Sequence, residues 1–264
     1  MAEGYTYDNA WAEERKRLDG IEAQFDAGTI DVLKRVGIAP EWTCLEVGAG
    51  GGSIARWLCE RARRVVATDL DPRFVAVIDA PNLEARRHDI VAEPLEENAF
   101  DLVHSRMVLE HLPGRDAVLR KLIAALKSGG WLVLEDLDAS IVDTPLLVSA
   151  FPATRAEVFG RVNRGVIGVM RARGFDPHFA RRLPGALQAL DLASVGAVAR
   201  SDLVYGGSAA AAFARWTMVA LRDALVAAGP ITADDVDEAV RLADDPGFSW
   251  LRPPIIAAWG RKSS

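Results

Sequence analysis

The stretch Cys44-Leu45-Glu46-Val47-Gly48-Ala49-Gly50-Gly51-Gly52-Ser53 decides the fold of this chain of 264 residues. A short apolar run containing an acid is followed directly by a Gly-x-Gly-x-Gly loop, and Ile54 to Ala62 then has the spacing of an amphipathic helix. Glycines let the backbone turn sharply and approach a ligand closely, and a helix N-terminus presents unpaired N–H groups to it. The order of strand, glycine turn and helix therefore predicts a cradle for a nucleotide-like ligand.

Strands and helices alternate on either side of this stretch. The expected strands are short and apolar or β-branched: Thr43–Val47, Arg64–Thr68, Leu83–His88, Phe100–His104, Trp131–Leu134, Ser194–Val204 and Ile255–Gly260. The expected helices are Thr29–Val36, Arg115–Leu126, Leu147–Arg173, Phe179–Leu190, Ala209–Ala228 and Thr232–Ala243, the last with Thr232 as its N-cap. We expect no strand in residues 139–175. The alternation predicts an α/β fold with a doubly wound, mostly parallel sheet.

The composition limits the classes of function. The formal net charge is −6 and the 31 basic residues are scattered, which argues against nucleic acid as a partner. The two cysteines, Cys44 and Cys59, have no metal-ligand spacing, so we expect no bound metal and a reducing compartment. No apolar segment is long enough to cross a bilayer, and no signal-peptide pattern is visible. We therefore expect a cytoplasmic protein with no membrane partner, and a homodimer is compatible with the sequence.

Two ligands compete for the glycine loop. For NAD, Gly48-Ala49-Gly50 starts a dinucleotide fingerprint and Asp69 lies near the spacing of the ribose-binding acid. The third fingerprint position, however, is Ser53, and Gly52 comes one residue early. Glu46 stands just before the loop, where a carboxylate would repel a pyrophosphate. S-adenosylmethionine (SAM) has an ammonium, a sulfonium and no phosphate, so it would gain from this acid.

Two further acids fit SAM. Asp69, at the end of the second strand, can accept hydrogen bonds from both ribose hydroxyls because a carboxylate offers only acceptor oxygens. Asp89, at the end of the third strand, can accept from the exocyclic amine of adenine, with Ile90 beside it as apolar packing. Three acids at the ends of three consecutive strands would line the crevice in which doubly wound sheets bind ligands.

These segments resemble the successive motifs of class I SAM-dependent methyltransferases, in particular the small-molecule, type 11/25-like kind. The resemblance covers residues 40–138 strongly and is carried by Leu45–Gly52, Ala67–Leu70, Asp89–Ile90, Phe100–Leu112 and Leu126–Trp131. It implies a Rossmann-like methyltransferase fold with seven strands. The seventh, antiparallel strand of that fold can be supplied by Ile255–Gly260.

The resemblance also implies a role for each matching residue. At the methionine end of SAM, Glu46 would hold the ammonium, directly or through water, and Gly48 and Gly50 would allow close approach of the backbone. Ser105 and Arg106 would contact the methionine moiety through their backbones. At the adenosine end, Asp69 would bind the ribose, Leu70 and Ile90 would sandwich the adenine, and Asp89 would bind its amine. The product cofactor would be S-adenosylhomocysteine.

The acceptor side is less defined by the sequence. Methyl transfer needs mainly in-line positioning and exclusion of water, and a base only where the acceptor must lose a proton. His111, just past the fourth strand, and Asp138, four residues past the fifth, are the candidate bases. We expect His104, on the fourth strand, to be buried.

We expect one domain with four parts. Residues 1–40 form an N-terminal helical lid, in which Tyr5, Tyr7 and Trp11 would close over the cofactor. Residues 41–138 form the SAM-binding core, 139–178 a helical cap insertion, and 179–264 the C-terminal part of the core with a helical insertion.

The resulting hypothesis is methyl transfer from SAM to an O, N or C atom of a small-molecule acceptor, with a biosynthetic or natural-product role. Two alternatives stay open: an NAD-dependent oxidoreductase, and a methyltransferase-like protein that binds SAM without transferring a methyl group.

Overall fold

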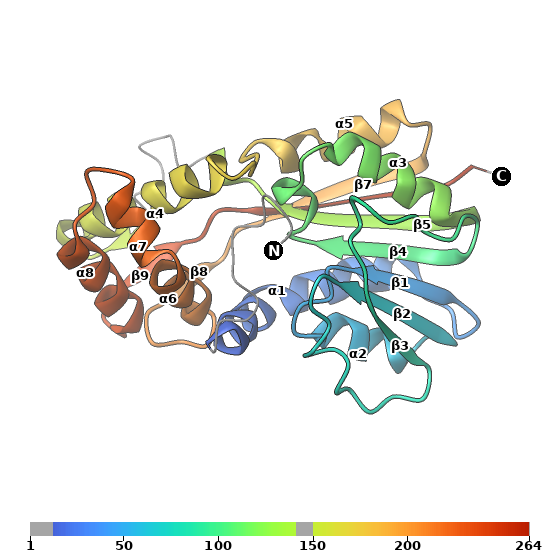
Figure 1. Ribbon diagram of the computed structural model, residues 1–264, viewed down its shortest axis with the longest axis horizontal. Coiled ribbons are helices and arrows are strands. Elements are labelled where there is room, and N and C mark those ends of the chain that lie inside the picture. Colours follow the sequence, from blue (N-terminus) through green and yellow to red (C-terminus); the bar gives the residue numbers. More distant parts are fainter. Residues whose placement is uncertain (1–12, 141–149, 264) are drawn as a thin grey trace. The chain divides into compact units, whose positions relative to one another are not determined.

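The computed structural model describes residues 13–140 and 150–263. The chain divides into two compact units (Figure 1). Of the described residues, one unit comprises 13–25, 138–140, 150–178 and 200–254, and the other comprises 26–137, 179–199 and 255–263. We call the second the sheet unit and the first the helical unit. That residues 1–40 and 139–178 act as lid and cap stays a prediction.

The sheet unit is built on a seven-stranded sheet in the order β3-β2-β1-β4-β5-β10-β7. The neighbouring pairs from β3 to β5 run parallel, and β10 runs antiparallel to β5. This confirms the doubly wound, mostly parallel sheet and its antiparallel strand near the C-terminus. The strands are β1 (Thr43–Val47), β2 (Arg64–Asp69), β3 (Leu83–Arg87), β4 (Phe100–Arg106), β5 (Leu126–Leu137), β7 (Ala193–Arg200) and β10 (Ile255–Arg261).

Side chains alternate between the two faces of this sheet, and each face has its own apolar cover. One face packs its odd-numbered β1 residues, Leu45 and Val47, with apolar residues of α3 (Arg115–Ala125) and α5 (Phe179–Ala189). The other packs Cys44 with the last two turns of α1 (Glu14–Val36) and with α2 (Ser53–Cys59). Figure 1 shows α3 and α5 on one side of the strands and α2 on the other. Because β1 and β4 are covered on both faces, they are buried strands, and their ends meet at one edge.

The helical unit has a separate apolar core. Phe159 packs against Phe248 and Trp250, with ring centroids 5.1 and 4.8 Å apart. Its elements after residue 138 are β6 (Ala150–Phe151), α4 (Ala153–Arg171), β8 (Leu203–Tyr205), α6 (Ala211–Ala220), α7 (Arg222–Ala227), α8 (Ala233–Asp244) and β9 (Ser249–Leu251). Thr232 caps α8 as expected: its side chain accepts from the N–H of Asp235, and the Asp235 carboxylate accepts from the N–H of Thr232.

Four expectations about these elements were wrong. The helix expected over Thr29–Val36 is only the last part of α1, which begins at Glu14 and includes Gly20, where a Cβ would lie only 2.2 Å from the backbone nitrogen of Phe213. The strand expected over 194–204 ends at Arg200, and residues 203–205 join a second sheet of order β6-β9-β8. Residues 139–175 do contain a strand, the short β6, and the helix expected over 209–228 is divided into α6 and α7.

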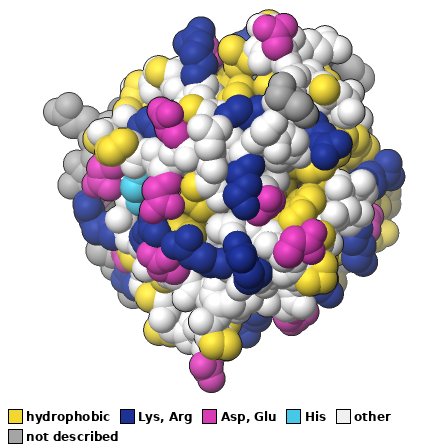
Figure 2. Space-filling model, turned by 90° about the vertical axis from the view of Figure 1, so that its right-hand side faces the viewer, with side chains coloured by type: hydrophobic (Ala, Val, Ile, Leu, Met, Phe, Trp, Pro, Cys, Tyr) yellow, Lys and Arg dark blue, Asp and Glu magenta, His cyan; other side chains and the backbone are white. Residues whose placement is uncertain are grey.

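Charged side chains of both signs share the surface. On the face shown in Figure 2, Lys and Arg side chains lie among Asp and Glu side chains and apolar patches. Some of the charged side chains of the chain form ion pairs: Arg64 lies 2.6 Å from Glu84, and Lys127 lies 2.7 Å from Asp101. None of the helices in residues 13–140 and 150–263 is long and apolar enough to span a membrane.

Candidate functional site

The glycine loop after β1 is held tightly against β2. The N–H groups of Gly48 and Ala49 both donate to the carbonyl oxygen of Thr68, at 2.8 and 3.0 Å. Gly48 has a φ of +69°, and a Cβ at this position would lie 2.3 Å from Cγ2 of Val108. Both the backbone conformation and the neighbouring side chain therefore require glycine here.

Asp69, the last residue of β2, holds the loop from the other side. Its Oδ2 accepts from the N–H of Gly50 at 2.9 Å, and its Oδ1 accepts from the N–H of Asp71 at 3.0 Å. Burial raises the pKa of Asp69, and these hydrogen bonds oppose that rise. An ionised carboxylate offers about four acceptor sites, so two N–H donors leave it able to accept from ligand hydroxyls as well.

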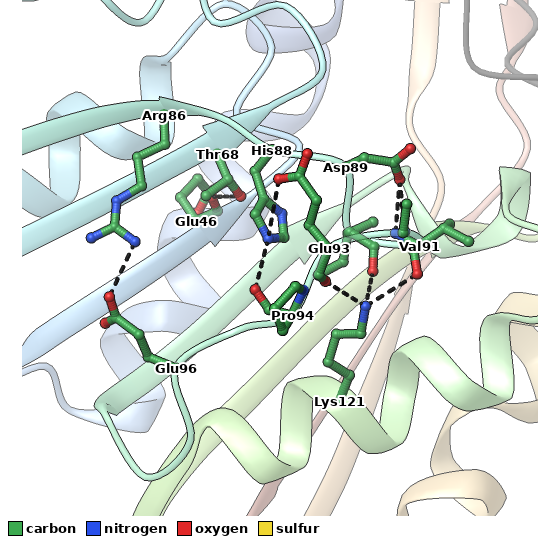
Figure 3. Close-up of polar contacts among 12 residues, drawn as sticks. Glu46, Thr68, Arg86, His88, Asp89, Val91, Glu93, Pro94, Glu96 and Lys121 are labelled. Carbon is green, nitrogen blue, oxygen red and sulfur yellow. Dashed lines mark hydrogen bonds and ion pairs between the residues drawn. The ribbon is translucent and has the colours of Figure 1, made fainter.

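Asp89 lies two residues beyond β3 and forms the turn there (Figure 3). Its Oδ1 accepts from the N–H of Val91 at 2.9 Å and from that of Ala92 at 3.2 Å. Ile90 in the middle of this turn is buried. Asp89 therefore shapes the turn in addition to lying next to the predicted adenine site.

Lys121 of α3 fixes the same turn from below. Its Nζ donates to the carbonyl oxygens of Ile90, Val91 and Glu93, at 2.6, 3.2 and 2.7 Å (Figure 3). One ammonium thus uses its three donors on three carbonyl groups of one short segment. Sequence reasoning missed Lys121 because a lysine on a helix carries no local sign of such a contact.

Glu46 lies on β1 beside His104 of β4. Its Oε2 accepts from Nδ1 of His104 at 2.6 Å, and the Nε2 of His104 lies 3.5 Å from Oε1 of Glu135 on β5. All three side chains are buried. The expected burial of His104 is confirmed, but its contact with Glu46 was not predicted, because the register between β1 and β4 has no local signature in the sequence.

Arg106, the last residue of β4, joins this strand to α1. Its Nη1 donates to Oδ1 of Asp26 and to Oγ1 of Thr29, both at 2.9 Å. The hydroxyl of Ser53 donates to the same Oδ1 of Asp26 at 3.1 Å. The side chain of Arg106 thus positions α1, and a backbone contact with the cofactor would not compete with that role. The preceding residue, Ser105, is buried.

His111 lies in the short helix η1 (Leu109–His111) after β4 and is buried. Its Nε2 is 3.4 Å from Oε1 of Glu110. The other oxygen of Glu110, Oε2, accepts from the N–H of Leu137 at 2.6 Å, and the N–H of Glu110 donates to Oδ1 of Asp136 at 3.3 Å. Two buried carboxyl groups therefore join η1 to the end of β5 and support the candidate base.

The remaining candidates are distributed between the units. Leu70 directly follows β2, and Ile90 lies in the turn after β3, so both belong to the sheet unit. Asp138 belongs to the helical unit, where its Oδ1 accepts from the hydroxyl of Ser140 at 2.5 Å. Tyr5, Tyr7 and Trp11 lie outside the described residues. The roles of all these residues toward a ligand stay predictions.

Comparison with known proteins identifies the family of the chain. Residues 45–134, from β1 through most of β5, match the model of a methyltransferase domain family. The chain is 30% identical over 183 residues to "Methyltransferase str2" of Strobilurus tenacellus, a match that covers 67% of this chain and 62% of the relative. The chain belongs to the class I SAM-dependent methyltransferase family.

Two further comparisons show how far the similarity to known proteins extends. The chain is 30% identical over 131 residues to a ubiquinone biosynthesis O-methyltransferase of Xanthomonas oryzae pv. oryzae, covering 46% of this chain and 49% of that protein. The YcgJ protein of Bacillus subtilis has the same fold, with a TM-score of 0.59 over 90% of this chain and 99% of that one, at 16% identity. The chain thus spans about half to three-fifths of the length of these two curated relatives.

The sheet unit brings together most of the residues that the sequence predicted. Glu46, Asp69 and Asp89 all lie at the carboxyl ends of neighbouring strands, on β1, at the end of β2 and just past β3. Doubly wound sheets bind their ligands at this edge. The residues that sequence reasoning missed, Glu135 and Lys121 above all, contact predicted site residues or their loop and come from other elements.

Proposed function

We propose that this chain transfers a methyl group from SAM to an O, N or C atom of a small-molecule acceptor, in a biosynthetic or natural-product pathway. SAM supplies a methyl group on a sulfonium, which is a good leaving group. The residues of the chain therefore have to bind the cofactor, align the acceptor atom and exclude water.

One observation supports SAM over NAD more than any other: the N–H groups of the glycine loop are already engaged. Those of Gly48 and Ala49 donate to Thr68, and that of Gly50 donates to Asp69. A loop that holds a pyrophosphate needs its N–H groups for the phosphate oxygens. Here these groups instead hold the loop to β2, next to carboxylates that would repel a phosphate. A cofactor with an ammonium, a ribose and no phosphate fits this arrangement.

The three carboxylates have distinct parts in this proposal. Glu46 is a buried acid near the end of β1 and would bind the ammonium of the methionine moiety. Asp69 keeps acceptor capacity for the ribose hydroxyls, and Asp89 fixes the turn that carries Ile90 beside the adenine. Of the two candidate bases, His111 has the better support, because the carboxyl group of Glu110 lies next to its imidazole.

The acceptor class is inferred from the relatives. The name of the Xanthomonas relative places it in ubiquinone biosynthesis, as an O-methyltransferase. A phenol or alcohol of this kind must lose a proton during attack, which gives a base such as His111 a function. The formal net charge of −6 disfavours a nucleic acid as the acceptor.

Calorimetry with SAM, S-adenosylhomocysteine and NAD tests the cofactor. We expect both SAM and its product to bind and NAD not to bind, and Asp69→Asn to weaken SAM binding roughly tenfold or more, the loss of about 1.5–3 kcal/mol expected for hydrogen bonds to a charged group. Asp79→Asn is the matched control, because it removes an exposed acid outside the binding edge of the sheet. Binding of NAD without binding of SAM would contradict the proposal.

Incubation with methyl-labelled SAM and a panel of phenols, alcohols and amines tests the transfer. Labelled product from one class of acceptor identifies the atom that is methylated. SAM binding without transfer to any acceptor or cell-extract component would favour the alternative in which the chain binds SAM and does not methylate.

His111→Gln tests the base on its own. We expect turnover with a hydroxyl acceptor to fall about 100-fold or more, the lower range for general-base catalysis, while the Kd for SAM is unchanged. A large loss of thermal stability with unchanged turnover per folded molecule would instead assign His111 to packing.

A further inference from the structure

A buried imidazole lies between two buried carboxyl groups in the centre of the sheet unit. His104 has an exposure of 0%, Glu46 of 3% and Glu135 of 2%. Nδ1 of His104 is 2.6 Å from Oε2 of Glu46, and Nε2 is 3.5 Å from Oε1 of Glu135. Ionisable groups are rarely buried without a reason, because the desolvation of each one costs several kcal/mol. The predicted binding roles and the methyl transfer itself do not use this histidine.

The strand register explains how the three side chains meet. Glu46 pairs directly with His104 across β1 and β4, so both side chains are on the same face of the sheet. His104 pairs with Val133 of β5, and Glu135 is two residues farther along on that face. All three side chains therefore point toward α1, whose residue Thr29 donates from Oγ1 to Oε2 of Glu135 at 3.1 Å.

The two contacts of the ring are unequal. The contact with Glu46 is a short, well-formed hydrogen bond, whereas the 3.5 Å contact with Glu135 is longer than ordinary N–H···O bonds. Within the described part of the chain, Nε2 of His104 and Oε1 of Glu135 have no other hydrogen-bond partner. The imidazole is therefore hydrogen-bonded to Glu46, and Glu135 acts on it mainly through its charge.

The surrounding charges keep the ring protonated. Burial alone would lower the pKa of His104, but the carboxylates of Glu46 and Glu135 outweigh it and raise that pKa to about 9. Farther out on the same face, Arg106 of β4 is paired with Asp26 of α1. Two carboxyl groups therefore flank the imidazole, and the Arg106–Asp26 pair lies farther along the same face.

A metal ion is not the partner that this cluster suggests. The described residues contain no group of three or more His, Cys, Asp and Glu side chains that is arranged to hold a metal. Of the three residues, only Glu46 is predicted from the sequence to bind the cofactor. The hydrogen bond from His104 occupies one of its two carboxyl oxygens. The cluster is therefore best understood from what it does to Glu46.

We propose that His104 is a positioning residue for the cofactor: its ring holds the Glu46 side chain in one rotamer, ready for the cofactor ammonium, while Glu135 holds the ring. This inference rests on the proposed function, because it takes Glu46 as the group that binds the ammonium. A carboxylate fixed before binding loses less conformational freedom when the cofactor arrives. Through Glu46, His104 acts on the methionine end of the cofactor and leaves the adenosine end unaffected.

Two ligands separate this role from a purely structural one. S-adenosylhomocysteine carries the amino-acid ammonium, and 5′-methylthioadenosine has the same adenosine and thioether without it. In the full chain, we expect His104→Gln to weaken S-adenosylhomocysteine binding by roughly threefold to tenfold, the range expected when a charged hydrogen bond becomes a neutral one. The Kd for 5′-methylthioadenosine should change less than about twofold, a difference too small to reflect a lost hydrogen bond.

Further variants test whether the effect passes through Glu46. His104→Gln should add little to the loss already caused by Glu46→Gln, since two residues that act as one unit are not additive. Glu135→Gln should weaken the same ligand and leave 5′-methylthioadenosine unaffected. His178→Gln, which replaces an exposed histidine of the helical unit, is the matched control, and thermal melting establishes that each variant is folded.

The outcomes are distinct. Equal weakening of both ligands in folded His104→Gln, or additive losses with Glu46→Gln, would overturn the positioning role and leave the proposed function intact. If the wild-type chain bound neither ligand, the proposed function would fail and this inference with it.

Discussion

Glu110 and Asp136 place two carboxyl groups in one buried site, where each makes the ionised form of the other less favourable. Burial raises the pKa of Glu110 to about 8, although the N–H of Leu137 and the charge of Arg115 oppose the rise. Burial and then Glu110 raise the pKa of Asp136 as well. The pair therefore retains protons at neutral pH, and its ionisation belongs to both residues together. The protonation of these two side chains, which join η1 to the end of β5, therefore depends on pH.

This pair makes the stability of the fold depend on pH. A carboxyl group whose pKa is raised in the folded chain contributes stability that is complete below its unfolded value, near 4.5 for Glu110, and is lost as the pH rises to about 8. We expect Glu110→Gln to make the free energy of unfolding fall less steeply over this range, by up to about 1.4 kcal/mol per pH unit, the value for one proton. Urea unfolding between pH 5 and 8 measures it.

The control for Glu110→Gln is Glu97→Gln, which removes an exposed carboxyl group. An equal change of slope in both variants would show that the buried pair does not titrate as described.

At the scale of elements, the glycine loop needs a left-handed backbone conformation at Gly48 and room beside Val108 that a Cβ would fill. Gly48→Ala places a methyl group at φ +69° and within 2.3 Å of Val108. Gly37, after α1, has a φ of +80° with nothing within 4 Å of the added Cβ. We expect Gly37→Ala to cost about 1–2 kcal/mol for the left-handed backbone alone, and Gly48→Ala to cost more and to weaken SAM binding.

A double-mutant cycle separates the cost of the left-handed backbone at Gly48 from the cost of the collision with Val108. Val108→Ala should cost less stability in the Gly48→Ala background than in the wild type, because it also removes the collision. Additive losses in thermal or urea unfolding would mean that the collision is relieved in another way.

The sequence predicts the elements whose burial is local and misses those that depend on distant partners. The ends of β1 and β10 are predicted to within one residue, because apolar runs bounded by polar or glycine residues mark them. Residues 127–130, which lie between an expected helix and an expected strand, are part of β5: Phe100 pairs with Leu126 but Leu102 pairs with Trp131, so the segment bulges between the two pairs. The C-terminal segment holds it there, as Lys262 donates from its N–H to the carbonyl oxygen of Gly130 at 2.8 Å.

The same reasoning applies to the site. Glu46, Asp69 and Asp89 were predicted because each follows or ends an apolar run. Glu135 and Lys121 could not be predicted from the sequence. Glu135 meets His104 only through the strand register, and Lys121 meets the turn after β3 only through the packing of a helix against a loop.

Lys121 gives an element-scale prediction. Lys121→Met retains the length of the side chain but loses its three bonds to the turn after β3. We expect a loss of about 1.5–3 kcal/mol, the range for hydrogen bonds to a charged group, and faster hydrogen exchange at Val91 and Ala92. Arg120→Met, on the neighbouring exposed residue, is the control. Unchanged exchange in the Lys121 variant would show that the turn is held without this lysine.

At the scale of the whole molecule, the chain passes between the two units near residues 25, 137, 178, 199 and 254. Neither unit is a continuous piece of sequence, and α1 itself belongs to both. Each unit nevertheless has its own apolar core, around Phe159 and Phe248 in the helical unit and on both faces of the sheet in the other. The described residues assigned to the cofactor all lie in the sheet unit, whereas Asp138 lies in the helical one.

The division into two units predicts which amides cofactor binding protects from hydrogen exchange. At 100 times its Kd, SAM should stabilise the chain by about 2.7 kcal/mol, since it binds only the folded state. Hydrogen exchange should slow first at residues 48–52, 69–71 and 88–92, because these segments line the binding edge of the sheet. Amides of α8, such as those of Val236 and Leu242 in the core of the helical unit, should respond only through global unfolding. Mass spectrometry with and without S-adenosylhomocysteine measures both sets in one experiment, and protection of α8 without protection of the glycine loop would place the cofactor elsewhere.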